Sequence, residues 1–219
     1  KQVYNDPKLR RRILKSRAAY RDKSRGVGEI RAKARVVLIG CCDPDLERLT
    51  RDSPTPTRLS ECILMSVAAS GANGDFNNDG RIWRLWVSDA EKAFLQGDQD
   101  TTERSGQPLY MLPPKDPIII EANVYTAPLY LITSNAYGLP NAPRVWYNKV
   151  HKTVTMHNFK QHSFDRCLYY HLGEDNLLDC LLIIHVDDAG NLLRDFPGEH
   201  SGEHVSMGKR NSCEFGDAR

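Results

Sequence analysis

The segment Leu181-Leu182-Ile183-Ile184-His185-Val186-Asp187-Asp188 joins an apolar run to a pair of carboxylates. Four aliphatic residues in a row suit a buried strand, and the two carboxylates that follow place the end of this strand at a turn. Neighbouring carboxylates repel each other unless a cation neutralises them, and a divalent metal ion is such a cation. An Asp-Asp pair alone is weak evidence for a metal site, because surface turns often contain one.

A second predicted strand also runs into a carboxylate. The short apolar segment from Ile82 to Val87 is followed by Ser88-Asp89. If the two strands lie side by side, their aspartates form a cage for two Mg²⁺ ions, with Mn²⁺ as a substitute. Mg²⁺ prefers few carboxylates together with waters and substrate phosphates. Two such ions about 3.5–4 Å apart can activate a 3′-hydroxyl and stabilise the leaving pyrophosphate of an in-line displacement.

The remaining pattern mixes helices and strands without a regular β-α-β alternation, which indicates an α+β fold. Apolar residues at helical spacing predict two helices, at 58–70 and 142–159, and also allow a basic helix at 10–20. Strands are predicted on both sides of the Gly-rich turn at 23–29, at 82–87, from 118 to 120 and at 177–186, with an antiparallel return through Leu192-Leu193.

The composition is that of a globular protein, with 40% hydrophobic and 26% charged residues. No apolar run approaches the roughly 18 residues of a membrane span, and the basic first residues do not resemble a secretory signal. Six cysteines form no CxxC pair, so we expect reduced thiols in an intracellular protein. The adjacent Cys41 and Cys42 are expected to be structural or incidental rather than redox active.

Charge is distributed unevenly along the chain. Residues 1–35 contain 13 Lys and Arg against 3 acidic residues, whereas the remainder is acidic. A basic segment joined to an acidic body predicts a polyanionic partner bound by the basic segment, with the acids concentrated elsewhere. The alternative is a solvated basic tail.

Seven motifs occur in an order that resembles the copia-type retrotransposon reverse transcriptases, over residues 16–197. The motifs are Lys33-Ala34-Arg35-Val36-Val37, Ser53-Pro54-Thr55, Asp89 to Asp98 (DAEKAFLQGD), Tyr110-Met111-Leu112-Pro113-Pro114, Tyr137 to Tyr147 (YGLPNAPRVWY), Asp165-Arg166-Cys167-Leu168-Tyr169 and His185-Val186-Asp187-Asp188. Each motif is weak alone, but seven in register are specific.

The resemblance implies a role for individual residues. Asp89, Asp187 and Asp188 match the catalytic, metal-binding aspartates, and the carbonyl group of Ala90 would also touch a metal. Phe94 matches the aromatic residue that lies under the sugar and excludes a 2′-hydroxyl, which would make the enzyme prefer deoxynucleotides. The alternative for Phe94 is an ordinary core aromatic.

Three further residues match nucleotide-binding positions. Lys33 and Arg35 match the strand that holds the incoming triphosphate, where cations offset phosphoryl charge. Gly138 matches the glycine against which the templating base pair lies, because a bare Cα permits close approach. The alternative for Lys33 and Arg35 is a solvated strand face.

The resemblance also implies a domain organisation and partners. We expect a palm built on a split β-α-β, ferredoxin-like sheet together with fingers, and neither a thumb nor a ribonuclease H domain within these residues. The expected division is 1–21 as a basic N-terminal arm, 22–88 and 98–142 as fingers, and 89–97 and 143–219 as palm. Expected partners are an RNA or DNA template with its primer and deoxynucleoside triphosphates, in cytoplasmic virus-like particles or the nucleus, with no membrane association.

The sequence departs from the family pattern at several positions. His185 replaces the usual tyrosine before the aspartate pair, Asn141 replaces a glutamine, and Ala18 replaces a common tryptophan. These changes favour a fragment or a decaying copy, so one alternative is a non-catalytic relic that folds and binds nucleic acid. A metal-dependent nuclease that uses the same acids is the other alternative, but the DEDD-like or histidine–metal set that would support it is missing.

Two further motifs are weak. Residues 75–82 follow the start of a calcium-binding EF-hand loop, but Trp86 occupies the position that needs a bidentate glutamate. His200 and His204 have the spacing of helical zinc ligands, but Gly198 and Gly202 disfavour a helix there.

Overall fold

The computed structural model describes residues 2–24, 26–71, 81–98, 103–104, 106–186 and 188–195. The chain forms two compact units, one of Lys1–Asp52 with Lys92–Trp146 and the other of Ser53–Glu91 with Tyr147–Arg219. Helices and strands occur in both units, so the predicted α+β class is confirmed. Within the described residues, no helix combines the length and the apolar character needed to cross a bilayer.

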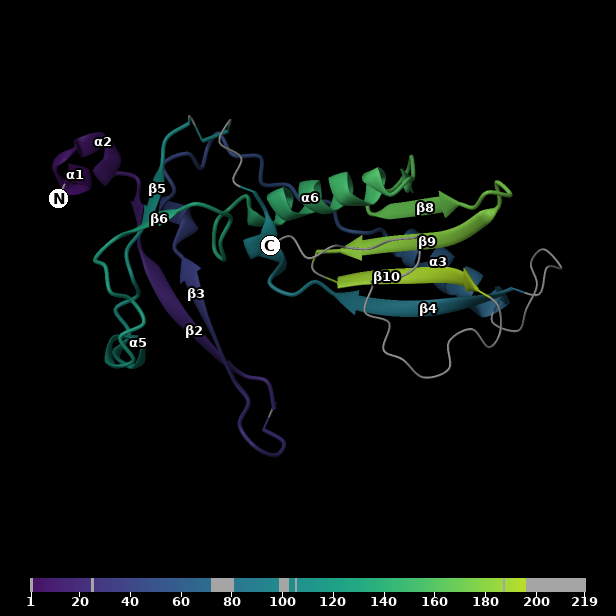
Figure 1. Ribbon diagram of the computed structural model, residues 1–219, viewed down its shortest axis with the longest axis horizontal. Coiled ribbons are helices and arrows are strands. Elements are labelled where there is room, and N and C mark those ends of the chain that lie inside the picture. The colour runs from purple at the N-terminus through teal and green to yellow at the C-terminus, as the bar shows by residue number, and fades with distance from the viewer. Residues whose placement is uncertain are drawn as a thin grey trace. The chain divides into compact units, whose positions relative to one another are not determined.

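The second unit is built on one antiparallel sheet. Its elements are α3 (Arg58–Gly71), β4 (Ile82–Asp89), most of α6 (Ala142–Met156), β7 (Lys160–Gln161), β8 (Leu168–Leu172), β9 (Leu178–His185) and β10 (Asp188–Asp195). In the described residues the strand order is β4-β10-β9-β8-β7 (Figure 1). Since β10 is antiparallel to both neighbours, β4 and β9 run in the same direction with β10 between them, as in a split β-α-β unit.

Side chains from α3 and the sheet form the core of this unit. Leu64 of α3 packs with a group of sheet residues that are all less than a tenth exposed: Trp83, Leu168, Leu181, Ile183 and Leu192. Gly71 ends the helix against the ring of Trp83, where a side chain at position 71 would collide with the indole. The apolar run of β9 is buried on both faces of the sheet, because Leu182 and Ile184 are also buried.

Asp165 ties the start of α3 to the start of β8. One carboxylate oxygen accepts hydrogen bonds from the Thr57 amide (2.8 Å), the Thr57 hydroxyl (2.9 Å) and the Ser60 hydroxyl. The other oxygen accepts one from the Cys167 amide at 2.8 Å. Thr57 also caps the helix, since its hydroxyl accepts the Ser60 amide at 3.2 Å. The Asp165–Tyr169 motif therefore positions a helix that begins more than a hundred residues earlier.

The first unit contains short elements. They are α1 (Gln2–Asn5), α2 (Pro7–Arg10), β1 (Ile13–Leu14), β2 (Ser16–Asp22), β3 (Ala32–Leu38), η1 (Gly40–Cys42), α4 (Ala93–Gln96), β5 (Leu109–Met111), α5 (Pro117–Glu121) and β6 (Tyr130–Ile132). β2 and β3 form an antiparallel hairpin, and in the described residues β1, β5 and β6 form a second sheet. The apolar core of the first unit comprises Leu14, Leu38, Leu109, Leu139 and Ala142.

A buried ionic network crosses the first unit, and the sequence pattern did not predict it. Arg12 donates two hydrogen bonds to Asp45, at 2.6 and 3.2 Å. Arg104 donates to Asp43 at 2.7 Å and to the side-chain oxygen of Asn141 at 2.9 Å. Asn141, one of the departures from the family pattern, is therefore a buried acceptor for Arg104.

Two of the predicted elements are wrong. The segment 10–20 is not a basic helix, because its second half lies in β2 and pairs residue by residue with β3. Residues 13–14 and 16–21 of the range expected as an arm are thus strand. The segment 118–120 is helical in α5 rather than a strand, because Pro117 takes the first helical position and the Asp116 side chain accepts hydrogen bonds from the amides of Ile118 and Ile119.

Candidate active site

Asp89 and Asp188 are direct cross-strand partners at one end of the sheet of the second unit. Asp89 is the last residue of β4, Asp188 is the first residue of β10, and the register sets them opposite each other. Residues opposite each other on antiparallel strands have Cβ atoms about 5 Å apart and share a face. Both side chains are exposed. Two solvent-exposed carboxylates therefore lie beside each other where β4 ends and β10 begins.

This donor set suits a hard divalent cation. Opposed like charges destabilise a strand pair, and a cation between them removes that repulsion. Carboxylate oxygens with room for water and phosphate are the ligands that Mg²⁺ prefers. Among the described residues no three His, Cys, Asp or Glu side chains gather as a metal site. Asp187 lies outside the described residues, so its role as the third carboxylate stays a prediction.

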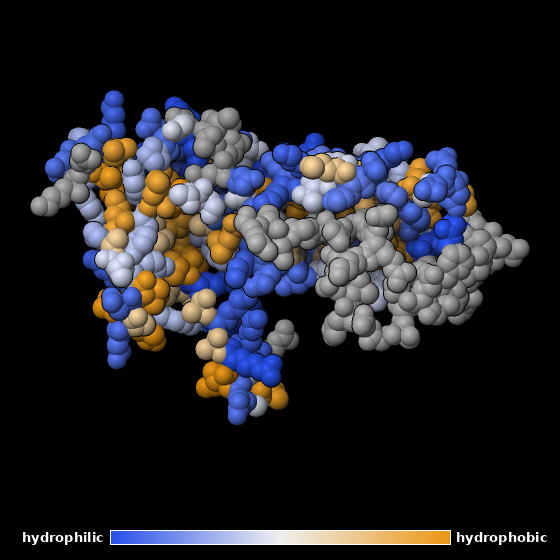
Figure 2. Space-filling model, viewed as in Figure 1, coloured by the Kyte–Doolittle hydropathy of each residue, from blue (hydrophilic) through white to orange (hydrophobic). Residues whose placement is uncertain are grey.

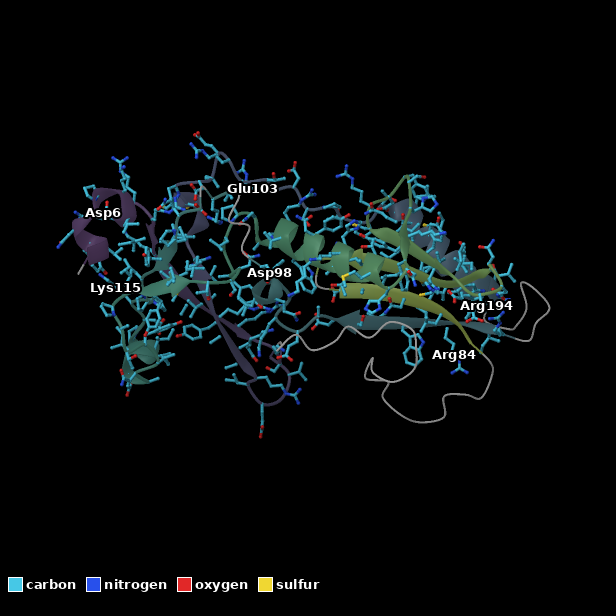
Figure 3. All side chains as sticks on the ribbon, turned by 45° about the horizontal axis from the view of Figure 1, so that its top comes forward. Asp6, Arg84, Asp98, Glu103, Lys115 and Arg194 are labelled. Carbon is cyan, nitrogen blue, oxygen red and sulfur yellow. The ribbon has the colours of Figure 1, made fainter. Side chains whose placement is uncertain are left out.

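The tight turn from β9 to β10 positions Asp188. Val186 has a φ of 59°, which reverses the chain within the turn. His185 and Asp188 face each other across it as a register pair, and both are exposed. The residue that replaces the family tyrosine thus neighbours the carboxylates. Arg84 on β4 and Arg194 on β10 mark the opposite end of these strands (Figure 3).

One face of the β2–β3 hairpin is strongly basic. Lys33 and Arg35 are two residues apart in β3, so their side chains share one face of the hairpin. The register sets Arg21 directly opposite Lys33. These three residues line a surface pocket together with Asp22 and Lys23. Hydrophilic residues dominate the hairpin in Figure 2, although Val27 and Ile30 near its turn are exposed hydrophobic residues. Because cations placed directly opposite each other repel, this face favours an anionic ligand.

Tyr137 contacts two of the predicted nucleotide-binding residues, Arg35 and Phe94. The Arg35 guanidinium lies over its ring, 5.3 Å from the centroid. The Phe94 ring meets it edge-on, with centroids 5.9 Å apart. The Tyr137 carbonyl accepts a 2.8 Å hydrogen bond from the Leu38 amide. Phe94 is half-buried and packs partly against the core of the first unit, so it combines a packing contact with an accessible face.

Gly138 is required by its own backbone contacts. Its φ is +90°, a value that residues with a side chain rarely adopt. A Cβ at this position would collide with the Leu38 carbonyl oxygen and crowd the Val37 side chain. The bare Cα therefore permits close approach of strand β3, whereas its predicted contact with a templating base pair stays a prediction.

The predicted residues fall into two groups. Asp89, Ala90 and Asp188 belong to the second unit, while Lys33, Arg35, Phe94 and Gly138 belong to the first. Tyr137 and Arg21 were missed as functional candidates. Tyr137 could have been found as the aromatic residue before Gly138 in its motif, but Arg21 is identified only by the strand register. His200, His204 and most of the calcium-like loop lie outside the described residues.

A protein-family model described as "Reverse transcriptase (RNA-dependent DNA polymerase)" matches residues 2–193. Neither the curated proteins nor the solved structures gave a match to the chain.

Proposed function

The chain belongs to the reverse transcriptase (RNA-dependent DNA polymerase) family, and we propose that it is a copia-type domain that extends a primer by two-metal nucleotidyl transfer. Members of this family are nucleotidyltransferases that act on a primed template and deoxynucleoside triphosphates. In the proposed reaction the primer 3′-hydroxyl oxygen forms a bond to the α-phosphorus of the incoming nucleotide, and pyrophosphate leaves.

The register between β4 and β10 carries this proposal. The register sets Asp188 opposite Asp89 at an exposed strand end. Ala90 follows Asp89 directly, and its carbonyl group is a further oxygen donor. Asp89, Asp187 and Asp188 would hold two Mg²⁺ ions, which lower the charge of the phosphates and activate the attacking oxygen when bound. The chain itself contributes fixed carboxylates on a rigid sheet, which keeps the donor atoms in place.

The basic face of the hairpin supports the nucleotide-binding part of the proposal. Lys33, Arg35 and Arg21 would bind the triphosphate, because clustered cations stabilise phosphoryl oxygens. The cation–π contact with Tyr137 fixes the direction of Arg35. Phe94 would lie under the deoxyribose, where its ring leaves no room for a 2′-hydroxyl.

We assign the second unit to the palm and the first unit to the fingers. Residues 53–88 were expected in the fingers. They share a compact unit with β10, so we assign them to the palm. The units also divide within α6, between Trp146 and Tyr147, whereas the expected division lies at the start of that helix.

Primer extension on poly-rA with oligo-dT and Mg²⁺ tests the proposal. Asp89→Asn and Asp188→Asn should each lower the extension rate by about 10³-fold, since losing a metal ligand removes about 4 kcal/mol of transition-state stabilisation. Glu174→Gln is the matched control, because Glu174 is exposed on the turn between β8 and β9 at the far end of the same sheet. If the parent and all three variants extended the primer equally slowly, the assignment of Asp89 and Asp188 as metal ligands would be refuted.

A nucleic-acid-binding relic is the second candidate, and His185 beside the carboxylates favours it. A relic would bind the primed template with the salt dependence of a basic surface but would not extend it. Restoring tyrosine with His185→Tyr separates the two, because a copy that lost activity through this residue would regain extension.

A further inference from the structure

Cys41 and Cys42 form an exposed pair of thiols on the short helical turn η1. Their sulfur atoms are 4.0 Å apart, in contact with each other. The remaining described cysteines are different. Cys62 is exposed but has no cysteine neighbour in the sequence, and Cys167 and Cys180 are buried. Burial, reinforced by the charge of Asp165, raises the pKa of Cys167 to about 12. Among the described thiols, the pair in η1 is therefore the one arranged for chemistry between two sulfurs.

A disulfide between adjacent residues is strained and easily reduced. The Cα atoms of consecutive residues lie about 3.8 Å apart, whereas disulfides usually bridge Cα atoms about 4.4–6.8 Å apart. Strained, exposed disulfides are the labile and regulatory ones. A bond between these two sulfurs would thus be a reversible modification rather than a structural staple.

The residues on both sides of the pair are closely packed. A Cβ on Gly40 would collide with the Gly138 carbonyl oxygen and lie 2.8 Å from Cδ of Pro140. On the other side, Asp43 follows the pair directly and is held by the buried Arg104. A change in the backbone of η1 must therefore press on the turn at residues 137–140, which contains Tyr137 and Gly138.

We propose that Cys41 and Cys42 are a redox modification site that a small disulfide such as glutathione disulfide converts reversibly to a vicinal disulfide. One cysteine, as its thiolate, attacks the small disulfide and releases one glutathione thiolate. The second cysteine then attacks the mixed disulfide, which closes the Cys41–Cys42 bond and releases the second glutathione. The two protein thiols lose two hydrogens in total, and the oxidant is reduced to two glutathione molecules.

The electrostatics of the pair suit these two steps. The pKa of Cys42 is raised by its hydrogen bond with Cys41 and by the negative charge that Cys41 would carry, while Lys15 acts in the opposite direction. The raised pKa favours the thiol form of Cys42, whose sulfur lies 4.0 Å from that of Cys41 and is in place for the second attack.

Mass spectrometry of the full chain after treatment with glutathione disulfide tests the site, and this measurement does not depend on polymerase activity. We expect the peptide containing residues 41 and 42 to lose two hydrogens, with reversal by dithiothreitol. Cys62 should instead gain a glutathionyl group. The variant Cys42→Ser should stop at the first step and keep a glutathionyl group on Cys41. A lasting glutathionyl group on Cys41 or Cys42 of the parent chain, or no reaction at either residue, would overturn the proposal.

Hydrogen exchange tests the effect on the neighbouring turn. The Leu38 amide donates to the Tyr137 carbonyl, so its exchange reports whether β3 and the turn separate. We expect several-fold faster exchange in the oxidised parent and no change in oxidant-treated Cys42→Ser. Equal exchange in both would show that the turn does not sense the modification.

Discussion

Replacing Asp165 with asparagine tests whether one buried carboxylate holds α3 against β8. The side chain is 4% exposed and accepts four hydrogen bonds, three on one oxygen and one on the other. Asparagine has nearly the same shape but only one acceptor oxygen. If that oxygen keeps the three bonds from Thr57 and Ser60, the new NH₂ group faces the Cys167 amide, and two donors then oppose each other.

The expected cost follows from these contacts. Losing one hydrogen bond to a charged acceptor costs about 1.5–3 kcal/mol, and a buried amide without a partner adds a similar amount, although the two are not fully additive. We expect Asp165→Asn to lower the free energy of unfolding by about 2–3 kcal/mol. Since a chain of this size loses about 2–4 °C per kcal/mol, its melting temperature should fall by about 4–12 °C. Asp165→Ala, which removes all four bonds, should cost about 3–5 kcal/mol.

The same effect should depend on pH. Burial acts to raise the pKa of Asp165, but the hydrogen bonds from Ser60, Thr57 and Cys167 outweigh it and hold the pKa below the ordinary value. A carboxyl with a lowered folded-state pKa stabilises the fold above its unfolded pKa of about 3.9, and this contribution is lost as the pH falls through the folded value. The difference between the parent and Asp165→Asn should thus be constant from about pH 7 to pH 5 and shrink below about pH 4.

Urea unfolding of the parent and the variant across this pH range is the assay, with Glu174→Gln as the control for the change of charge. Glu174 is exposed, so its substitution should leave stability unchanged within about 0.5 kcal/mol. Equal stability of Asp165→Asn and Glu174→Gln at pH 7 would show that the Asp165 carboxylate does not hold α3 against β8. A difference that persists unchanged below pH 3 would show that the carboxylate charge is not its source.

Three other substitutions test the first unit. Phe94→Val should open space for a 2′-hydroxyl, so the ratio of kcat/KM for deoxy- over ribonucleotides should fall while primer extension is retained. Unfolding of the variant would support a core role for the ring, and an unchanged ratio would disprove the exclusion of the 2′-hydroxyl by Phe94. Gly138→Ala should lower the free energy of unfolding by about 3 kcal/mol in thermal denaturation, because of its positive φ and the collision with the Leu38 carbonyl; a stability equal to the parent would contradict this. Arg21→Gln should lower the slope of log affinity for nucleic acid against log salt by about 1 with no change in melting temperature, and an unchanged slope would mean that Arg21 is only solvated.

Local patterns in the sequence were sufficient for the elements that bury a repeated apolar face. The helices α3 and α6, the strand β9 and its antiparallel return in β10 were predicted, because helical spacing and a continuous aliphatic run have few other solutions. The placement of Asp89 and Asp188 at strand ends followed from the same runs. The ordered motifs indicated a reverse transcriptase, and the family model shows that broader family, whereas the copia type stays a prediction.

Short segments without such a face were predicted less well. The segment 10–20 has a thin apolar face at helical spacing, and pairing with β3 outweighs that weak preference. For the segment 118–120, the apolar residues favoured a strand. A helix forms because the Asp116 side chain accepts hydrogen bonds from the amides of Ile118 and Ile119, and because Pro117 takes the first helical position. In both cases a partner or a cap decides between two states of similar energy.

The contacts between residues that are distant in the sequence were found only in the folded chain. The sequence contains Asp165, Thr57, Arg104, Asn141, Tyr137 and Arg21, but nothing local relates them to one another. Asp165 meets Thr57 across 108 positions, and Arg21 becomes part of a basic face because the register sets it opposite Lys33. Hydrophobic periodicity is a property of one segment, and it indicates which face of that segment is buried. Hydrogen bonds, ion pairs and strand register depend on two segments at once, so they are fixed when the chain packs.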